Sequence, residues 1–204
     1  MGIALEEEIR ERTVKGNEAS FANKTLFKSN LVSRISKLKL YRSVIRPTAV
    51  YGCDTWVLEG SIIQKLCVFE RKISRDIIGP IEAADGIWRI NTNKELDESI
   101  KHRDITNYVK AQRLSWFGYI NRMPYTSTVK RLHKWKPFTG RPAGRPKSRW
   151  EADVSNDLKK MELVKWAEQV QDCLKWKNIV EKDMTVSELQ RCREREREKK
   201  KKKK

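Results

Sequence analysis

The sequence GSIIQKLCVFERKISRDIIG, residues 60–79, decides the fold class. Five of its apolar residues recur at the spacing i, i+4, i+7, i+11 and i+15, which forms one stripe on an α-helix. These residues are Ile62, Leu66, Phe69, Ile73 and Ile77. Gly79 and Pro80 follow and are typical of a helix end. The stretch predicts a long amphipathic helix, and we expect a mainly α fold.

The residues before this stretch predict another helix, from about Lys24 to Ile45. Its apolar stripe would consist of Leu31, Ile35, Leu38, Tyr41 and Ile45. Pro47 is expected to stop it by disfavouring helical geometry at Arg46. We interpret residues 49–51 as a short extended piece ended by Gly52, and residues 4–15 as a short exposed helix.

The residues after the stretch begin with a loop, 81–103, that contains a short helix near 94–101. A longer helix is predicted from the capping residue Asp104 to Met123. Its buried face would carry Ile105, Val109, Trp116 and Ile120. Three prolines and two glycines within residues 125–148 indicate a linker or a turn-rich arm. Amphipathic helical patterns resume at 150–161 and 166–180.

We therefore expect four parts: a helical unit at 1–123, a basic irregular arm at 124–149, a small helical unit at 150–184 and a disordered basic tail at 185–204. The tail alternates Arg and Glu from Arg193 to Glu198 and ends in six lysines. It contains too little apolar material to pack into a core.

Positive charge dominates the composition, with a net charge of +18. Such a charge favours a polyanionic partner, nucleic acid first and an anionic membrane surface second. The charge is also segregated, because residues 19–53 and 105–150 contain no acidic residue. Long stretches of one sign indicate a surface that neutralises phosphates rather than a merely soluble surface, which interleaves both signs.

The region from 134 to 149 holds two further basic patterns. Gly140-Arg141-Pro142 and Gly144-Arg145-Pro146 repeat a unit similar to the core of an AT-hook, although Thr139 and Ala143 stand where an AT-hook has arginine. Such a unit suits a minor groove or a phosphate backbone, and it is nearly as typical of a plain turn-forming linker. Lys134-Trp135-Lys136 places an aromatic ring between cations, which suits stacking on an unpaired base.

These patterns give a set of expected nucleic-acid contacts. The residues are Arg34, Lys37, Arg42, Arg46, Lys130, Arg131, Lys134, Trp135, Lys136, Arg141, Arg145, Lys147 and Arg149.

Several classes of function are not indicated. The sequence contains no Asp-Asp pair of the kind that holds metal ions in polymerases, no nucleophile–base set and no Gly-rich phosphate loop, so we predict no catalytic residue and no cofactor. The cysteines, Cys53, Cys67, Cys173 and Cys192, lie far apart and predict free thiols rather than a zinc site. We expect neither a signal peptide nor a membrane span, and a nuclear or cytoplasmic, non-secreted protein.

A set of short motifs occurs in a defined order along the chain. They are KLYRSVIRP (39–47), YGCDTW (51–56), VFERKI (68–73), GP (79–80), WRI (88–90), NKEL (93–96), QRLSWFG (112–118) and GRPKSRW (144–150). Together they resemble non-LTR (LINE-type) retrotransposon endonuclease–reverse transcriptases over about residues 5–184. Members of that family more often show a small residue and then Glu where this chain has Cys53-Asp54.

The resemblance implies that the chain corresponds to the thumb and post-thumb region, without the endonuclease domain, the fingers or the catalytic palm. Residues 24–78 would form a helical thumb that grips a template–primer duplex. The arm with the Gly-Arg-Pro repeats would make an accessory contact. The expected function is sequence-independent binding of DNA or RNA by a truncated element. The alternatives are a host-retained chromatin-binding module, a helical interaction protein with acidic partners, and a pseudogene product without function.

Overall fold

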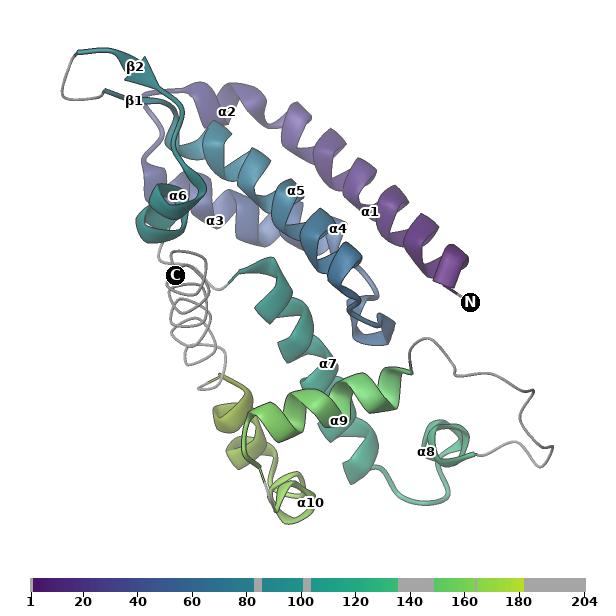
Figure 1. Ribbon diagram of the computed structural model, residues 1–204. Coiled ribbons are helices and arrows are strands. Elements are labelled where there is room, and N and C mark those ends of the chain that lie inside the picture. The colour runs from purple at the N-terminus through teal and green to yellow at the C-terminus, as the bar shows by residue number, and fades with distance from the viewer. Residues whose placement is uncertain (1, 83–85, 101–103, 136–148, 164, 182–204) are drawn as a thin grey trace, which may run out of the picture. The chain divides into compact units, whose positions relative to one another are not determined.

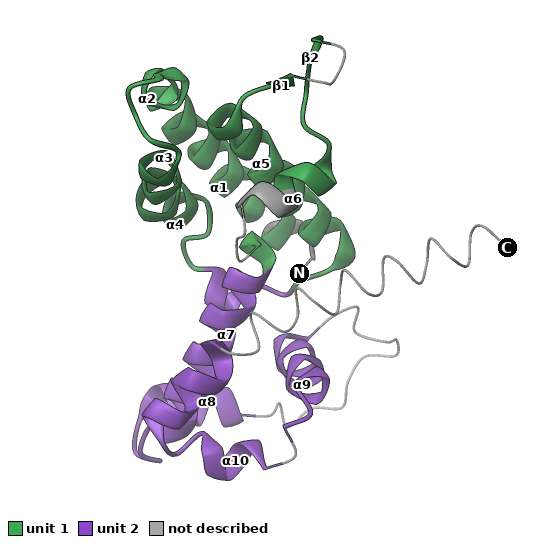
Figure 2. Ribbon diagram, turned by 90° about the vertical axis from the view of Figure 1, so that its left-hand side faces the viewer, with its two compact units in different colours: residues 1–52, 58–106 green, residues 53–57, 107–204 purple. Residues whose placement is uncertain are grey.

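The computed structural model describes residues 2–82, 86–100, 104–135, 149–163 and 165–181. These residues are mainly helical, which confirms the predicted fold class, and the strands among them form one short antiparallel pair (Figure 1). The chain divides into two compact units (Figure 2). Unit 1 contains residues 1–52 and 58–106, and unit 2 contains residues 53–57 and 107–204. The division therefore falls inside the helical unit that the sequence predicts at 1–123.

The elements have the following bounds. Those of unit 1 are α1 (Gly2–Ala22), α2 (Lys24–Lys28), α3 (Arg34–Leu40), a π-helix (Tyr41–Ile45), α4 (Arg46–Ala49), α5 (Gly60–Ile78), β1 (Ile81–Glu82), β2 (Trp88–Arg89) and α6 (Asn93–Ile100). Those of unit 2 are a 3₁₀-turn (Cys53–Thr55), most of α7 (Ile105–Arg122), α8 (Thr128–Lys134), α9 (Trp150–Lys160), α10 (Trp166–Gln169) and a further helical stretch at residues 173–181.

Helix α1 is longer than predicted and contributes to the core of unit 1. Gly16 lies where α1 packs against α4 and α5, and a Cβ atom there would come within 2.7 Å of Phe69 and 2.8 Å of Ala49. Glycine inside a helix is unfavourable, so this close approach explains why it stands there. Ile9 of α1 is fully buried as well. The predicted helix at 4–15 is therefore confirmed, but it is neither short nor fully exposed.

The helix predicted from Lys24 to Ile45 is broken. α2 ends at Lys28, and α3 begins after Ser33, whose side chain accepts a hydrogen bond from the Ser36 amide. Two residues of the expected buried stripe are in solvent, Leu31 at 98% exposure and Ile35 at 68%. Only the end of the stripe, Tyr41 and Ile45, is buried.

Pro47 does not stop this helical segment. The Arg46 amide donates to the carbonyl of Tyr41, five residues back, and Arg46 has helical geometry. A regular α-helix would bring the proline ring against the carbonyl of Ser43, and the wider π-turn accommodates it. α4 then continues to Ala49, so the extended piece predicted at 49–51 is also wrong.

Helix α5 confirms the stretch on which the fold class was predicted. Ile62, Leu66, Phe69, Ile73 and Ile77 are all buried, and Gly79 ends the helix at φ 76° while its amide donates to Arg75. The hairpin of β1 and β2 follows and was not predicted; Ile81 pairs with Arg89 in it. α6 begins with a reciprocal cap between Thr92 and Glu95, close to the predicted bounds of 94–101.

A buried carboxyl group joins three segments of unit 1. Glu70 of α5 accepts hydrogen bonds from the Tyr41 hydroxyl at 2.8 Å and from the Ile105 amide at 2.9 Å. Burial, and after it the neighbouring charge of Asp104, raise the pKa of Glu70 to about 8. Asp104 also caps α7, as predicted, by accepting from the Thr106 amide at 3.1 Å.

Glu70 should make stability depend on pH. Its ordinary pKa is 4.5 and its pKa in the folded protein is about 8, so it is protonated in the folded chain where it would be ionised in the unfolded one. The contribution to folding is complete below the ordinary pKa and is lost as pH rises through the folded value. Between about pH 5 and about pH 8.5 the loss should be on the order of 2–4 kcal/mol. Glu70→Gln should remove most of this pH-dependent loss of stability.

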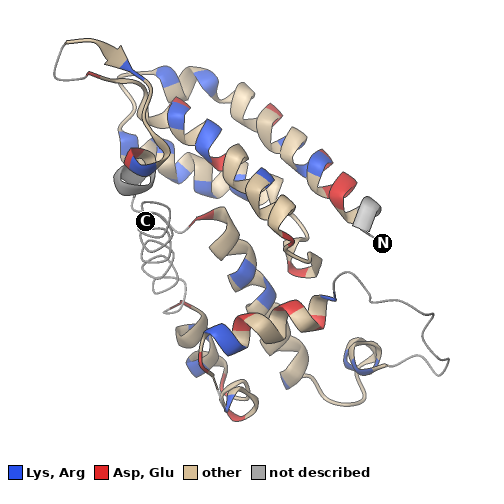
Figure 3. Cartoon of the chain, in the orientation of Figure 1, with Lys and Arg blue, Asp and Glu red and all other residues tan. Residues whose placement is uncertain are grey.

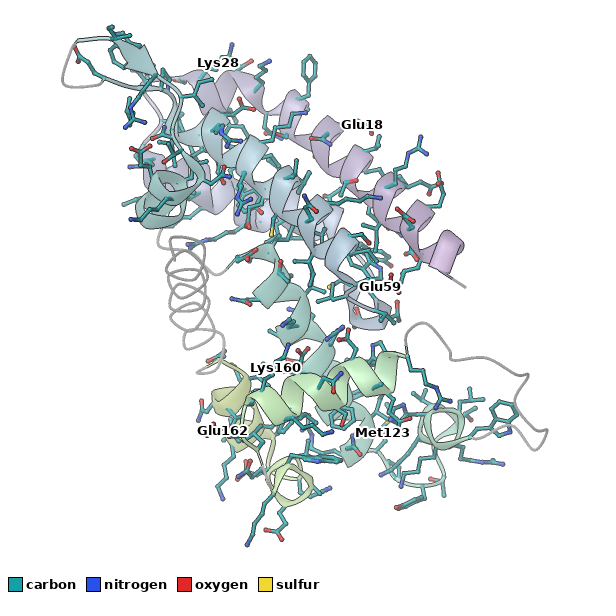
Figure 4. The ribbon with its side chains drawn as sticks, in the orientation of Figure 1. Glu18, Lys28, Glu59, Met123, Lys160 and Glu162 are labelled. Carbon is teal, nitrogen blue, oxygen red and sulfur yellow. The ribbon has the colours of Figure 1, made fainter. Side chains whose placement is uncertain are left out.

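Denaturant unfolding of the full chain at both pH values measures this difference. Glu18→Gln, which removes an exposed carboxylate from α1, is the matched control and should keep the wild-type pH dependence (Figure 4). The same pH dependence in the wild type and Glu70→Gln would show that Glu70 does not hold the proton.

The core of unit 2 is aromatic. Phe117 of α7 lies 5.1 Å from Trp166, 6.4 Å from Trp150 and 6.5 Å from Trp176 between ring centroids. Val154 and Leu158 of α9 pack into the same cluster, as their spacing predicts. The predicted buried face of α7 is only partly right, because Trp116 is half-buried while Ile105, Val109 and Ile120 are fully so.

Arg113 of α7 is completely buried and joins α7 to two other segments of unit 2. Its guanidinium forms ion pairs with Asp153 and Asp157 of α9 and donates to the carbonyl of Trp56 at 3.2 Å. Asp153 and Asp157 are one helical turn apart, so both reach the same guanidinium. Trp150 makes a parallel connection by donating from its indole to the carbonyl of Asp54. We call these residues the Arg113 cluster.

Gly118 seats the side chain of Trp176 on α7. A Cβ atom at Gly118 would lie 2.2 Å from the Trp176 indole nitrogen. Because Gly118 has no side chain, the indole comes close to α7, and its nitrogen donates to the carbonyl of Leu114 at 2.9 Å. Glycine is thus required at this position for a tryptophan far along the chain to close the core.

The structure corrects two further expectations about unit 2. Residues 128–134 of the arm predicted to be irregular form α8, and the stretch predicted at 166–180 is divided into α10 and residues 173–181. The Gly-Arg-Pro repeats at 140–146 and the tail at 185–204 lie outside the described residues.

Candidate nucleic-acid interface

The acid-free stretch of residues 19–53 forms the end of α1, then α2, α3, the π-helix and α4. Five of its bases are exposed, and they are Lys24, Lys28, Arg34, Lys39 and Arg42. α2 and α3 carry basic and no acidic side chains (Figure 3). We call Lys24, Lys28, Arg34 and Lys39 the α2–α3 basic surface.

An open depression lies at the α2 part of this surface. Phe21, Lys24, Thr25, Lys28 and Ser29 line it. Lys24 and Lys28 are one helical turn apart, and Lys28 stands at the end of α2 (Figure 4). Two ammonium groups beside two hydroxyl groups are donors suited to the oxygens of a phosphate. The ammonium of Lys24 also lies 5.6 Å from the centre of the Phe21 ring.

Two other residues of this stretch that were predicted to contact nucleic acid are not fully exposed. Lys37 is buried, and Arg46 is half-buried beside the Tyr41 hydroxyl, where its charge opposes the rise in the pKa of Tyr41. Neither side chain is presented to solvent in the way that the sequence pattern suggested. The spacing of charges alone does not reveal which side of a broken helix faces inward.

Many basic side chains of the second acid-free stretch, residues 105–150, form ion pairs or hydrogen bonds within the protein. Lys110 pairs with Asp157 at 3.3 Å, Arg113 is the centre of the Arg113 cluster, and Arg122 donates to the carbonyl of Val170 at 2.9 Å. Lys130 is buried and donates to the carbonyls of Asn121 and Met123 at the end of α7 (Figure 4). The expected phosphate contact by Lys130 is therefore replaced by a structural one.

The remaining predicted contacts fall into two groups. Arg131, Lys134, Trp135 and Arg149 are exposed. Lys136, Arg141, Arg145 and Lys147 lie outside the described residues. The expected contacts did not include Lys24, Lys28 and Lys39, which are exposed in the acid-free stretch of residues 19–53.

The described part of the chain also bears on three other kinds of site, namely metal, membrane and reactive-thiol sites. There, no group of three or more His, Cys, Asp or Glu side chains is placed to bind a metal ion. None of the described helices combines the length and the apolar character that crossing a membrane requires. Burial raises the pKa of Cys53 to about 12 and also raises that of Cys67, which disfavours the thiolate at both.

Comparison with known proteins adds one relationship. A protein of Caenorhabditis elegans named as an uncharacterized transposon-derived protein is 20% identical to this chain over 157 residues. The chain has a transposon-derived relative. The match covers 74% of this chain and 56% of the relative, so the chain spans little more than half the length of that protein. No family model and no solved structure matches the chain.

Three of the motifs behind the resemblance to retrotransposon reverse transcriptases meet in unit 2. YGCDTW supplies the buried Trp56 and the carbonyl of Asp54, QRLSWFG supplies Arg113, Leu114, Phe117 and Gly118, and GRPKSRW supplies Trp150. All of these residues belong to the core of unit 2. Their described roles are structural, which leaves the exposed basic residues as the candidate site.

Proposed function

We propose that this chain is the nucleic-acid-binding C-terminal part of a transposon-derived reverse transcriptase, and that it holds nucleic acid by its phosphates without reading the sequence. The observation that carries the proposal is the α2–α3 basic surface, where exposed bases follow one another with no acid among them. The transposon-derived relative supports the origin, and the order of the motifs supports the assignment to the thumb and post-thumb region.

Phosphate binding makes a quantitative prediction about salt. Each base that neutralises a phosphate releases counterions, so the logarithm of affinity falls with the logarithm of salt concentration by about 0.9 per contact on duplex DNA. With about six contacts the slope should be about −5. Replacing Lys24, Lys28, Arg34 and Lys39 together by Gln should make the slope shallower by about 3 to 4 and weaken binding to unrelated sequences equally.

A matched variant controls for the loss of net charge. Lys159, Lys160, Lys165 and Lys177 are exposed in unit 2 but are interspersed with acids such as Glu162 and Glu168. Their replacement by Gln removes the same charge and should leave most of the slope in place. Equal slopes for both quadruple variants would mean that only net charge matters. A wild-type slope near zero would contradict phosphate binding altogether.

One observation favours a second candidate, a helical interaction protein with an acidic partner. Leu31 and Ile35 are exposed beside Arg34 and Lys39. Exposed apolar side chains flanked by charges are typical of protein interfaces. Failure to bind duplex DNA or RNA at low salt would favour this candidate.

A further inference from the structure

Helix α8 is held in place from one side by buried contacts within unit 2. His133 lies 5.8 Å from the ring of Trp150 and 6.3 Å from that of Phe117. The ammonium of Lys130 donates to the two carbonyls at the end of α7, at 2.9 and 2.6 Å. These contacts fix the orientation of α8, so the side chains on its other side are presented to solvent in a defined arrangement.

The exposed residues of α8 and its two ends combine aromatic rings with cations. Tyr125, just before the helix, is 71% exposed, and Trp135, at its end, is 61% exposed. Leu132 is exposed between them, together with Arg131 and Lys134. We call these five residues the α8 surface. Two large aromatic side chains that are mostly exposed among cations indicate a candidate binding surface.

The cations act on the aromatic rings directly. The ammonium of Lys134 lies 4.4 Å from the centre of the Tyr125 ring and donates to its hydroxyl at 2.9 Å. This hydrogen bond and the nearby positive charges lower the pKa of Tyr125. The surface lies in the stretch of residues 105–150 that contains no acidic residue. A ligand that combines a flat ring with negative charge suits such a surface.

We propose that the α8 surface binds unpaired nucleotides, with a base stacked on Trp135 and the adjacent phosphates held by Arg131 and Lys134. Stacking on an aromatic side chain requires a base whose face is free, which duplex DNA does not offer. The chain therefore has a site for single strands that is separate in sequence from the α2–α3 basic surface. The inference rests on the proposed function only in assuming a nucleic-acid ligand.

The test compares probes that differ only in their bases. Anisotropy titrations at one salt concentration use a labelled oligo(dT), a strand of equal length with abasic sites in place of the thymines, and a duplex. The first two carry the same phosphates, so a difference between them measures base contacts. The wild type should bind oligo(dT) about 5- to 100-fold more tightly than the abasic strand.

Two variants separate stacking from charge. Trp135→Leu keeps an exposed apolar side chain and should bring the two affinities within about twofold, because it removes the stacked contact while the abasic strand is bound as before. Arg131→Gln with Lys134→Gln should weaken binding to both strands and preserve their ratio. All the substituted residues are exposed, and an unchanged unfolding midpoint checks that the fold is retained.

The outcomes distinguish this inference from the proposed function. Equal wild-type affinities for oligo(dT) and the abasic strand, with salt-dependent duplex binding, would overturn the α8 inference and leave the proposed function standing. A Trp135-dependent preference for oligo(dT) without duplex binding would support the α8 inference and overturn the proposed function. Trp135-dependent binding to phosphatidylserine vesicles, with no preference for bases, would assign the surface to membranes and overturn the inference.

Discussion

Arg113→Met is expected to lower the free energy of unfolding by about 3–5 kcal/mol. The methionine fills much of the volume of the arginine, but it leaves the buried carboxylate of Asp157 without its main cationic partner and the carbonyl of Trp56 without a donor. A buried charge that loses its partner keeps its desolvation cost. Lys110 still pairs with Asp157 and should soften the loss without replacing the guanidinium.

Denaturant unfolding of the full chain measures the change. Arg131→Met, at an exposed arginine of α8, is the matched control and should stay within about 0.5 kcal/mol of wild type. Adding Asp157→Asn to Arg113→Met removes the stranded charge and should restore part of the stability. Similar losses at Arg113 and Arg131 would show that the guanidinium of Arg113 is not enclosed.

Phe69→Ala is expected to cost about 3–5 kcal/mol. Phe69 is buried in the stripe of α5, and its ring lies against Gly16 of α1. Gly16 has no side chain that could move into the cavity, and Ala49 on the same side is small. The cavity would therefore remain largely unfilled, which places the cost toward the upper part of the range. Gln64→Ala, at an exposed position of α5, should change the stability by less than about 0.5 kcal/mol.

A double-mutant cycle tests the contact between α1 and α5. Gly16→Ala alone should destabilise by about 1–3 kcal/mol despite the better helix propensity of alanine, because its Cβ would meet Phe69 and Ala49. In the Phe69→Ala background the same substitution should cost less, since one of the two clashes is gone. Strictly additive costs would mean that Gly16 and Phe69 are not in contact.

Local patterns predicted the elements whose determinants lie close together in the chain. The stripe of α5 and its end at Gly79 fall within one stretch, and the cap at Asp104 needs only the two residues that follow it. In such cases periodicity and capping chemistry are sufficient. The start of α3 at Ser33 was also a local signal, but Leu31 and Ile35 had the spacing of a buried stripe and concealed it.

The errors near Pro47 and in α1 have tertiary causes. The π-turn keeps the helical segment intact where the local rule for proline predicts an end. Gly16 is favourable only because Phe69 and Ala49 come close to it. Neither effect can be read from the residues immediately around it.

The positive charge of the candidate site could be predicted from the sequence, but the residues that form the site could not. The acid-free stretches correctly indicated that bases such as Arg34 and Arg131 are exposed. Arg113 and Lys130 belong to the same stretch, yet their partners decide their roles. The partners of Arg113, Asp153 and Asp157, are 40 and 44 residues away in sequence. One signal was available: Asp153 and Asp157 are one turn apart beside Val154 and Leu158 on a predicted apolar face.

Residues 53–57 belong to unit 2, although the chain on either side of them belongs to unit 1. A ribosome makes this segment well before Arg113, Trp150 and Asp157, the residues around which it is finally held. During that interval Trp56, whose side chain is fully buried in the finished protein, lacks the rest of unit 2, and its carbonyl lacks the guanidinium of Arg113. Exposed aromatic surface on a nascent chain is bound by chaperones and promotes aggregation.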